Sequence, residues 1–339
     1  MAVAFCVSMC LTSVQPAAAA PLEIKFATQN PTAAWIHPNG YVPWAKKMEE
    51  ATEGRLKVTI YPAQTLGKGE AFYDLVKTGV ADMAFAMPLS TPGMFPIMEI
   101  FSLPLIPFKD AAIAAKIEWD LYNKYPAYKN EYPEVQILSL CATGPFFFAS
   151  VNRPVKKLDD LKGMKIRVPG GRPADAFKAI GAVPTMVPMP EVYISLEKGI
   201  IDCATVPWEG PLGYLPLRSI KYWSEGWGLY NVPFFVIMNK DSWKKIGEKD
   251  QKILMEKVWG EYGSIGFSKA VWDDSKVPAL KALSDNKIQI VKAEPGELEK
   301  WMERAKVINQ AYVDELKAKK LPAQEIYDEA MKKAIETNK

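Results

Sequence analysis

Histidine is almost absent from this chain of 339 residues, which contains only His37. Zinc sites usually combine several histidines or cysteines, and Ser-His-Asp and Cys-His catalytic groups each need a histidine. The sequence also has no CxxC pair. We therefore expect no metal and no cofactor, and hydrolytic chemistry would depend on a single side chain.

An excess of one charge is missing too. Lys and Arg total 42 against 39 Asp and Glu, the formal net charge is +3, and no dense basic run occurs. A chain without a field of one sign is a poor match to a phosphate backbone, so nucleic acid is not an expected partner. Hydrophobic residues make up 49% of the chain, enough at this length for two domains or one large one.

The first 20 residues contain no charged side chain and close on a run of alanines before Pro21. Their apolar stretch is interrupted by polar residues and is too short to cross a bilayer, which disfavours the alternative of a membrane anchor. We predict a secretory signal peptide at residues 1–20, cleavage near Ala20 and a soluble exported protein. Cys141 and Cys203 would remain, each at the end of an apolar run, where burial is expected.

Short β-rich runs alternate with helical periods from Pro21 to about residue 240, for example at 24–28, 56–62 and 135–141. Between the first two runs, apolar residues from Tyr41 to Ala51 recur every three or four positions and predict an amphipathic helix. After about Ser242 the pattern becomes mostly helical, with one brief strand at 288–291. This order predicts an α/β fold with long C-terminal helices.

Three runs carry a family resemblance, at residues 53–85, 158–171 (LDDLKGMKIRVPGG) and 179–207. With these runs in this order, the chain resembles the DctP-type substrate-binding proteins of TRAP transporters. The resemblance implies a periplasmic receptor, not an enzyme, that closes on a small solute, usually a carboxylate. It also implies delivery of that solute to the subunits of a sodium-driven membrane permease, although a sensor protein is an alternative partner.

The fold class that we predict is a two-domain α/β periplasmic binding protein with crossing strands and long C-terminal helices. No low-complexity linker separates the domains, so strands that cross between them would form a hinge. The expected boundaries are 21–143 plus 234–265 for domain I and 144–233 plus 274–320 for domain II, followed by a C-terminal helix at 321–339. A monomer and a dimer are both compatible with this pattern.

Arg167 is the strongest candidate for a binding residue. It interrupts the otherwise apolar strand 164–169, where a guanidinium is costly to bury unless an anion pairs with it. Its planar fork matches a carboxylate, and the resemblance places it where the family holds the carboxylate of the solute. A structural salt bridge is the alternative. Arg172, in a loop rich in glycine, is expected to face solvent.

Three predicted site positions depart from relatives that bind sugar acids. Phe147, Val206 and Met87 are apolar where some members carry an arginine, an asparagine and an acidic residue. This exchange predicts a cleft for an aromatic or other hydrophobic monocarboxylate, with a C4-dicarboxylate or a 2-oxo acid as alternatives. Phe146 and Phe148 flank Phe147, and the alternation of the strand decides which ring faces the cleft.

Four further residues complete the predicted site. Trp208 follows the strand at 200–206 and would form an aromatic wall or part of the core. Glu209 would accept a hydrogen bond from a solute hydroxyl or, less in keeping with the family motif, bind a cation. His37 and Trp35 lie in the loop after the first strand, where α/β clefts gather polar groups, and a helix-capping or surface role is the alternative for His37. The rival hypothesis of an enzyme finds little support, since no histidine lies near Asp202 and Cys203 in the sequence.

Overall fold

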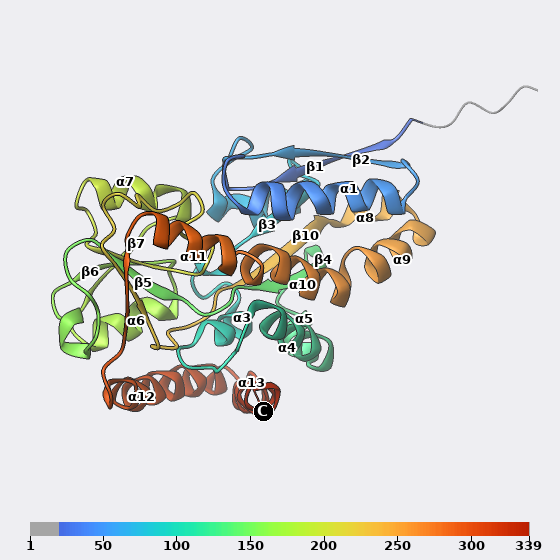
Figure 1. The fold of residues 1–339 in the computed structure, drawn as a ribbon. Coiled ribbons are helices and arrows are strands. Elements are labelled where there is room, and N and C mark those ends of the chain that lie inside the picture. Colours follow the sequence, from blue (N-terminus) through green and yellow to red (C-terminus); the bar gives the residue numbers. More distant parts are fainter. Residues whose placement is uncertain (1–19, 339) are drawn as a thin grey trace, which may run out of the picture.

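The computed structural model describes residues 20–338, which form two mixed sheets flanked by helices (Figure 1). We call the five-stranded sheet and its helices the first lobe and the six-stranded sheet and its helices the second lobe. The first sheet has the order β2 (Leu56–Tyr61), β1 (Leu22–Ala27), β3 (Met83–Ala86), β10 (Pro233–Asn239) and β4 (Val135–Ala142). The second has the order β11 (Gln289–Lys292), β9 (Tyr222–Glu225), β5 (Phe147–Ser150), β8 (Cys203–Val206), β6 (Lys165–Val168) and β7 (Val183–Met186). The predicted α/β fold is confirmed.

Helices cover both sheets. Those of the first lobe are α1 (Val42–Ala51), α2 (Phe72–Lys77), α3 (Pro96–Glu99), α4 (Ala111–Lys124), α5 (Pro126–Lys129), α8 (Lys240–Ile246), α9 (Glu248–Lys257) and α10 (Gly260–Ser268). Those of the second lobe are α6 (Arg172–Ala179), α7 (Val192–Glu197) and α11 (Lys276–Asp285). Short helical turns are η1 (His37–Tyr41), η2 (Gly69–Ala71), η3 (Pro88–Ser90), η4 (Ile100–Ser102), η5 (Leu158–Leu161), η6 (Met189–Glu191) and η7 (Lys269–Asp273). The chain ends in α12 (Glu297–Ala318) and α13 (Ala323–Thr337).

Helix α1 forms where the apolar spacing predicts it. Trp44, Ala45 and Met48 are buried on one face, and the exposed Lys46 lies on the other. Pro43 lies in the first turn, where its missing N–H costs no helical hydrogen bond. Strand β10, in contrast, is buried at all of its positions, because helices cover both faces of the sheet.

Two strand-linking segments, 143–146 and 226–232, carry the chain between the lobes and bond to each other. Val232 O accepts a hydrogen bond from Thr143 N at 3.0 Å, and Tyr230 O accepts one from Phe146 N at 3.2 Å. A third connection runs through α10, η7 and α11 along one side of the molecule (Figure 1). These crossings match the predicted topology, whereas the domain boundaries themselves stay a prediction.

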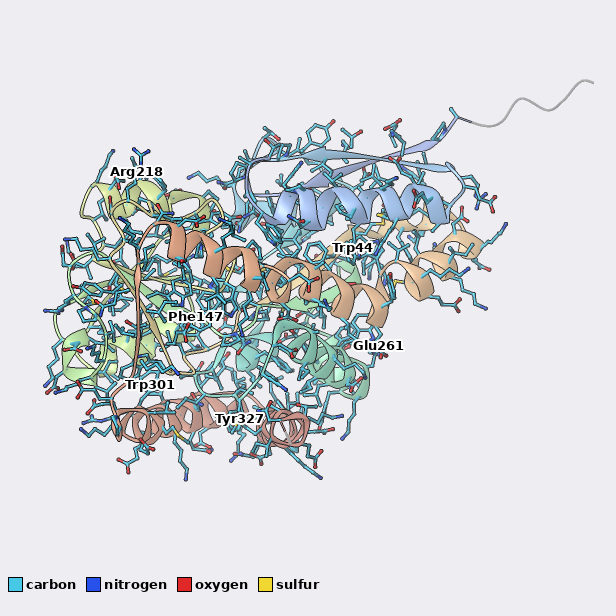
Figure 2. The ribbon with its side chains drawn as sticks, in the orientation of Figure 1. Trp44, Phe147, Arg218, Glu261, Trp301 and Tyr327 are labelled. Atoms are coloured by element: carbon cyan, nitrogen blue, oxygen red, sulfur yellow. The ribbon has the colours of Figure 1, made fainter. Side chains whose placement is uncertain are left out.

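The long helix α12 spans both lobes. Its Trp301 lies under the second lobe (Figure 2) and stacks on Phe177 of α6, with ring centroids 6.1 Å apart. Further along, Tyr312 donates a hydrogen bond to Pro96 O of the first lobe at 2.8 Å. Helix α13 then packs on the first lobe, where Glu329 pairs with Lys124 at 2.5 Å.

The expectation that Arg172 faces solvent is wrong. Its side chain is only 24% exposed, because α12 covers it and places Tyr312 against it, with the guanidinium 3.9 Å from the centre of the ring. Arg172 Nε lies 3.3 Å from Oε2 of the fully buried Glu99, so this arginine links the second lobe to the first.

Cys141 and Cys203 are both buried and unbridged, as predicted. The predicted signal peptide falls on residues 1–19 and Ala20, so nearly all of it lies outside the described residues. Within residues 20–338, no helix is both long enough and apolar enough to cross a membrane.

Candidate functional site

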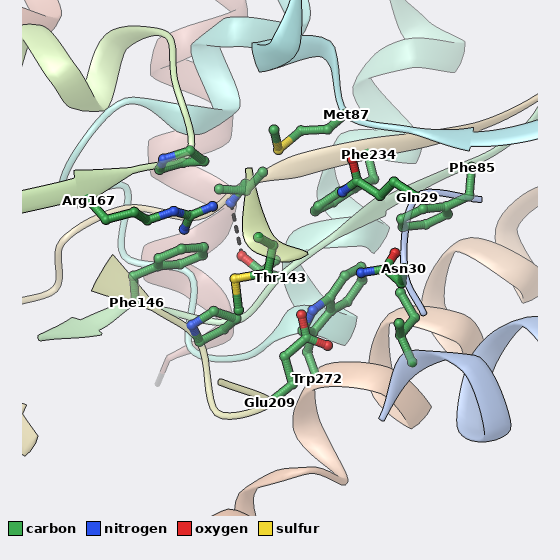
Figure 3. A pocket seen from close by; sticks show the side chains of 15 residues that line it. Gln29, Asn30, Phe85, Met87, Thr143, Phe146, Arg167, Glu209, Phe234 and Trp272 are labelled. Atoms are coloured by element: carbon green, nitrogen blue, oxygen red, sulfur yellow. Dashed lines mark hydrogen bonds between the residues drawn. The ribbon is translucent and has the colours of Figure 1, made fainter. Parts of the chain in front are cut away.

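A cavity lies between the two lobes, next to the crossing segments (Figure 3). Its empty volume is about 450 Å³, counted with its opening to solvent. Two ionisable residues, Arg167 and Glu209, line it. Its neutral polar side chains are Gln29, Asn30 and Thr143. Its remaining lining is apolar: Ile36, Phe85, Met87, Phe146, Pro169, Met189, Pro207, Val232, Phe234 and Trp272.

Strand β6 holds Arg167 rigidly at the wall of this cavity. Arg167 is 2% exposed, and it donates from Nε to Val187 O at 2.8 Å and from Nη1 to Thr205 O at 3.0 Å. Burial lowers the pKa of Arg167 to about 10. Within residues 20–338 no carboxylate forms an ion pair with it, and Nη2 has no hydrogen-bond partner. The guanidinium is therefore fixed in place and lacks the anion that its burial calls for.

Glu209 lies in the turn that follows β8, and its side chain points into the cavity beside Trp272 of η7 (Figure 3). Glu209 is 6% exposed, and burial raises its pKa to about 8. The nearby indole N–H of Trp272 and the positive charge of Arg167 both act to lower this pKa, but burial outweighs them. Trp272 Nε1 and Glu209 Oε2 do not meet hydrogen-bond geometry, and neither has a partner among the described residues. Glu209 is thus largely protonated at neutral pH.

Contacts across the cleft close the cavity on two sides. On one side, Asn30 of the first lobe donates from Nδ2 to Tyr214 OH of the second at 2.5 Å and accepts from Tyr41 OH at 2.7 Å. On the other side, Gly170 lies against Leu89 of η3, so close that a Cβ on this glycine would meet Leu89 O at 2.6 Å. Gly170 also has a φ of +128°, which favours glycine. The lobes therefore meet around the cavity.

The structure brings three of the predicted site residues together at the cavity, namely Arg167, Glu209 and Met87. Met87 reaches it because it directly follows β3. Whether these side chains contact a solute stays a prediction.

Phe147, Val206 and Trp208 lie outside the lining, against the core of the second lobe. Phe147 and Val206 are paired across β5 and β8, and both pack in the core of the second lobe. Phe147 packs on Trp208 at 4.4 Å between ring centroids and on Trp223 at 5.1 Å. Because side chains alternate along a strand, the neighbouring ring of Phe146 faces the cavity instead.

Trp35 and His37 also lie beside the lining, whereas Ile36 between them is part of it. Trp35 Nε1 donates to Val271 O at 2.9 Å, which anchors this segment to η7. His37 begins the π-helical turn η1, and its ring lies 6.1 Å from that of Tyr41. Burial lowers the pKa of His37, so its imidazole is neutral near pH 7.

Other lining residues escaped the sequence analysis. Asn30 and Thr143 follow the ends of β1 and β4, so the rule that clefts form at strand ends could have found them. Phe85 and Phe234 belong to apolar runs whose sequence indicates a buried strand but no binding site. Trp272 lies in the helical C-terminal third and carries no local signal for a site.

The family model for DctP, described as bacterial extracellular solute-binding protein, family 7, matches residues 26–316. The chain belongs to the DctP family. A curated member, the C4-dicarboxylate-binding periplasmic protein DctP of Rhodobacter capsulatus, is 27% identical over 280 residues, which are 80% of this chain and 80% of the relative.

Solved structures of TRAP solute-binding proteins are similar to this DctP-family chain. One from Rhodoferax ferrireducens, in complex with copurified benzoate, has a TM-score of 0.86 and 26% identity, with 93% of this chain and 98% of that chain covered. Another from Bordetella bronchiseptica, with bound (R)- and (S)-mandelate, has a TM-score of 0.86 and 29% identity, with 94% and 100% covered. The predicted family is confirmed.

Residues 20–338 contain no group of three or more His, Cys, Asp and Glu side chains that could hold a metal ion. The polar groups that line the cavity are the guanidinium of Arg167, the carboxyl group of Glu209 and neutral donors and acceptors. Such a set can bind and orient an anion.

Proposed function

We propose that this DctP-family chain is a periplasmic receptor for an aromatic or other hydrophobic monocarboxylate, which it delivers to the permease subunits of a TRAP transporter. The observation that carries the proposal is Arg167, a buried and fixed guanidinium without a carboxylate partner among the described residues, at the wall of a cavity lined largely by rings and methyl groups. A carboxylate would pair with it through its free donors, and the apolar lining would bury the rest of the solute.

The apolar lining argues against a sugar acid. Besides Arg167 and Glu209, only Gln29, Asn30, Thr143 and the indole N–H of Trp272 among the described residues offer polar side-chain groups to the cavity. Asn30 already bonds to Tyr41 and Tyr214, and Thr143 Oγ1 accepts from Val232 N. Each solute hydroxyl buried without a partner costs ~1–3 kcal/mol, so two or three would abolish micromolar binding.

The similar proteins support the same class of solute. Two structures with TM-scores of 0.86 contain benzoate and mandelate, both of which are aromatic monocarboxylates. A C4-dicarboxylate remains the second candidate, since a relative 27% identical is named for it. That solute would need a second cation, and Arg167 is the one basic side chain in the described lining.

Localisation and processing are part of the proposal. Cleavage near Ala20 would leave a mature chain that begins just before β1, whose first residue is Leu22. Intact mass measurement of the exported protein tests this point, and a retained N-terminus of 20 residues would contradict it.

A thermal-shift panel tests the solute class. A solute at ~1,000 times its Kd adds about 4 kcal/mol to the folded state, which raises the melting temperature by several degrees. We expect benzoate, mandelate or phenylacetate to stabilise the protein and succinate, malate and glucuronate to have no effect. Stabilisation by a dicarboxylate or a sugar acid alone would overturn the proposal. Recovery of the bound acid unchanged after hours of incubation separates a receptor from an enzyme.

A further inference from the structure

Two unpartnered polar atoms meet at one place in the cavity. Oε2 of Glu209 belongs to the second lobe, and Nε1 of Trp272 belongs to η7, which connects the lobes. Both residues line the cavity and both are buried, with 6% of Glu209 and 1% of Trp272 exposed. Figure 3 shows the carboxyl group and the indole side by side, with Arg167 at a separate point of the wall.

An unpartnered indole nitrogen is not enough by itself to indicate a ligand. Trp223, Trp259 and Trp301 are also buried without a partner for Nε1 among the described residues. None of these three lines the cavity, whereas Trp272 does and has an unpartnered carboxyl oxygen next to it. Because buried polar groups are normally satisfied, a donor and an acceptor left open at one point of a binding cavity call for one ligand group that serves both.

The chemistry of the pair selects the kind of group. A hydroxyl has one O–H donor and two lone pairs, so it can accept from Trp272 Nε1–H while it donates to Glu209 Oε2. If Glu209 is protonated, the second lone pair of the hydroxyl accepts from the carboxyl group instead. An ammonium offers no acceptor, so it cannot satisfy Trp272 Nε1–H in either protonation state of Glu209. A carboxylate offers no donor, so it cannot satisfy Glu209 Oε2 when Glu209 is ionised, but it could accept from both groups when Glu209 is protonated. A dicarboxylate is therefore the competing ligand that the test must include.

We propose that Glu209 and Trp272 form a hydroxyl-recognition site, and that the preferred solute is a hydroxylated aromatic monocarboxylate. This inference rests on the proposed function, since it takes the carboxylate of the solute to be held by Arg167. The ring then lies between two polar points, Arg167 at its carboxylate and the Glu209–Trp272 pair at its hydroxyl. Phe85, Phe146 and Phe234 line the same cavity and supply apolar surface to the ring.

Calorimetry on the full-length mature protein with matched acids tests the proposal. The acids are benzoate with its 3- and 4-hydroxy forms, phenylacetate with its 3- and 4-hydroxy forms, and benzene-1,3-dicarboxylate. We expect at least one hydroxylated acid to bind ~10-fold or more tightly than its bare parent, because the parent leaves the pair unsatisfied. The dicarboxylate should bind more weakly than the best hydroxylated acid.

The same panel separates the two proposals. If none of these acids binds, an aromatic acid is not the solute, and both the aromatic part of the proposed function and the hydroxyl site are wrong. If the bare acids bind as tightly as every hydroxylated form, the proposed function stands and the hydroxyl site is wrong. An ordered water would then be the partner of Glu209 and Trp272. Tightest binding of the dicarboxylate would also overturn the hydroxyl site.

Substitutions assign the preference to the two residues. Trp272→Phe removes the N–H and keeps an aromatic ring, and Glu209→Met removes the carboxyl at similar length. Each should reduce the preference for the hydroxylated acid over its parent by ~5- to 10-fold. Trp301→Phe is the matched control, since it removes an equally unpartnered buried N–H outside the cavity and should leave the preference unchanged. An unchanged preference in both site variants would overturn the assignment to these two residues. If a variant fails to fold, the comparison of hydroxylated and bare acids on the unmodified protein still tests the hydroxyl site.

Discussion

The first lobe gives the cavity rings and neutral polar groups, such as Phe85, Phe234 and Asn30, whereas the second lobe gives it both ionisable side chains, Arg167 and Glu209. From this difference we infer an order of docking and closure. The charge that attracts and holds an acid lies on one lobe, so the solute can dock there while the cleft is open. We expect the first lobe then to close over the solute as a largely apolar cover, with Asn30 bonded to Tyr214 across the cleft. Four experiments test this division of roles.

Removal of the anchor in the second lobe should have the largest effect. Arg167→Ala leaves the solute carboxylate buried without its partner, at a cost of ~3–5 kcal/mol, so calorimetry should show at least a ~100-fold loss of affinity. Arg167→Lys should recover part of it, because a point charge lacks the planar fork. Arg218→Ala is the control, since Arg218 is exposed on the same lobe and does not line the cavity. An unchanged affinity in the alanine variant would show that the anchor lies elsewhere.

A block to closure should have the next largest effect. In Gly170→Ala the new Cβ would lie 2.6 Å from Leu89 O, a backbone atom of the first lobe. If this overpacked contact destabilises the closed form by ~2 kcal/mol, solute binding should weaken ~30-fold. Small-angle scattering should also show less contraction on addition of solute than in the unmodified protein.

Gly163→Ala is the control for that experiment. Gly163 also has a positive φ, +67°, which lies in the left-handed region and strains an alanine less than the φ of +128° at Gly170, and a Cβ added at Gly163 would have no atom within 4 Å. Equal losses of affinity in the two variants would mean that strain in the second lobe, and not closure against Leu89, is responsible.

The hydrogen bond across the cleft should have a smaller effect. Tyr214→Phe leaves Asn30 Nδ2 without its acceptor in the closed form, at a cost of ~1 kcal/mol, so affinity should fall ~5-fold. Because the bond forms on closure, stopped-flow measurements should show the change in the dissociation rate more than in the association rate. A change in the association rate alone would contradict the proposed order of docking and closure.

A substitution far from the cleft should leave affinity unchanged and alter only stability. Glu118 of α4 is fully buried, accepts a hydrogen bond from Tyr128 OH at 2.7 Å, and has an Oε2 without a partner among the described residues. Burial raises the pKa of Glu118 well above its usual value, so the folded state holds a proton that the unfolded state releases.

The sign of the pH dependence follows from that proton. Above the unfolded pKa, the contribution of Glu118 to the free energy of unfolding falls by about 1.4 kcal/mol per pH unit until the folded pKa is reached. Denaturant unfolding between pH 5 and pH 8 should therefore show a shallower decline for Glu118→Gln than for the unmodified protein. Parallel curves would mean that Glu118 is ionised in the folded state.

Much of the fold could be predicted because its signals are local. The apolar spacing from Tyr41 to Ala51 predicted α1, and the β-rich runs predicted strands such as β2 and β4. Arg167 could be found because a guanidinium in an apolar strand is costly wherever that strand packs. These inferences need only the chemistry of a residue and its near neighbours in sequence.

The walls of the site could not be predicted in the same way. Phe147 and Phe146 are adjacent and identical, so only the tertiary structure shows that Phe146 lines the cavity and that Phe147 packs in the core of the second lobe. Arg172 was expected in solvent, since nothing near it in the sequence indicates that α12 covers it. A slip of one residue in a strand reverses the side chain's face, which makes such positions sensitive to tertiary pairing.

The sequence by itself determined the α/β pattern and the family, and it pointed to the arginine at the wall of the candidate site, because periodicity, motif order and the cost of burying a charge are properties of short segments. Only the tertiary structure decided what surrounds that arginine. Glu209 and Trp272 lie 63 positions apart in the chain (272 − 209) and come together only where η7 passes the turn after β8. Their meeting depends on how two lobes pack around the cavity, and long-range packing leaves no periodic trace in either segment.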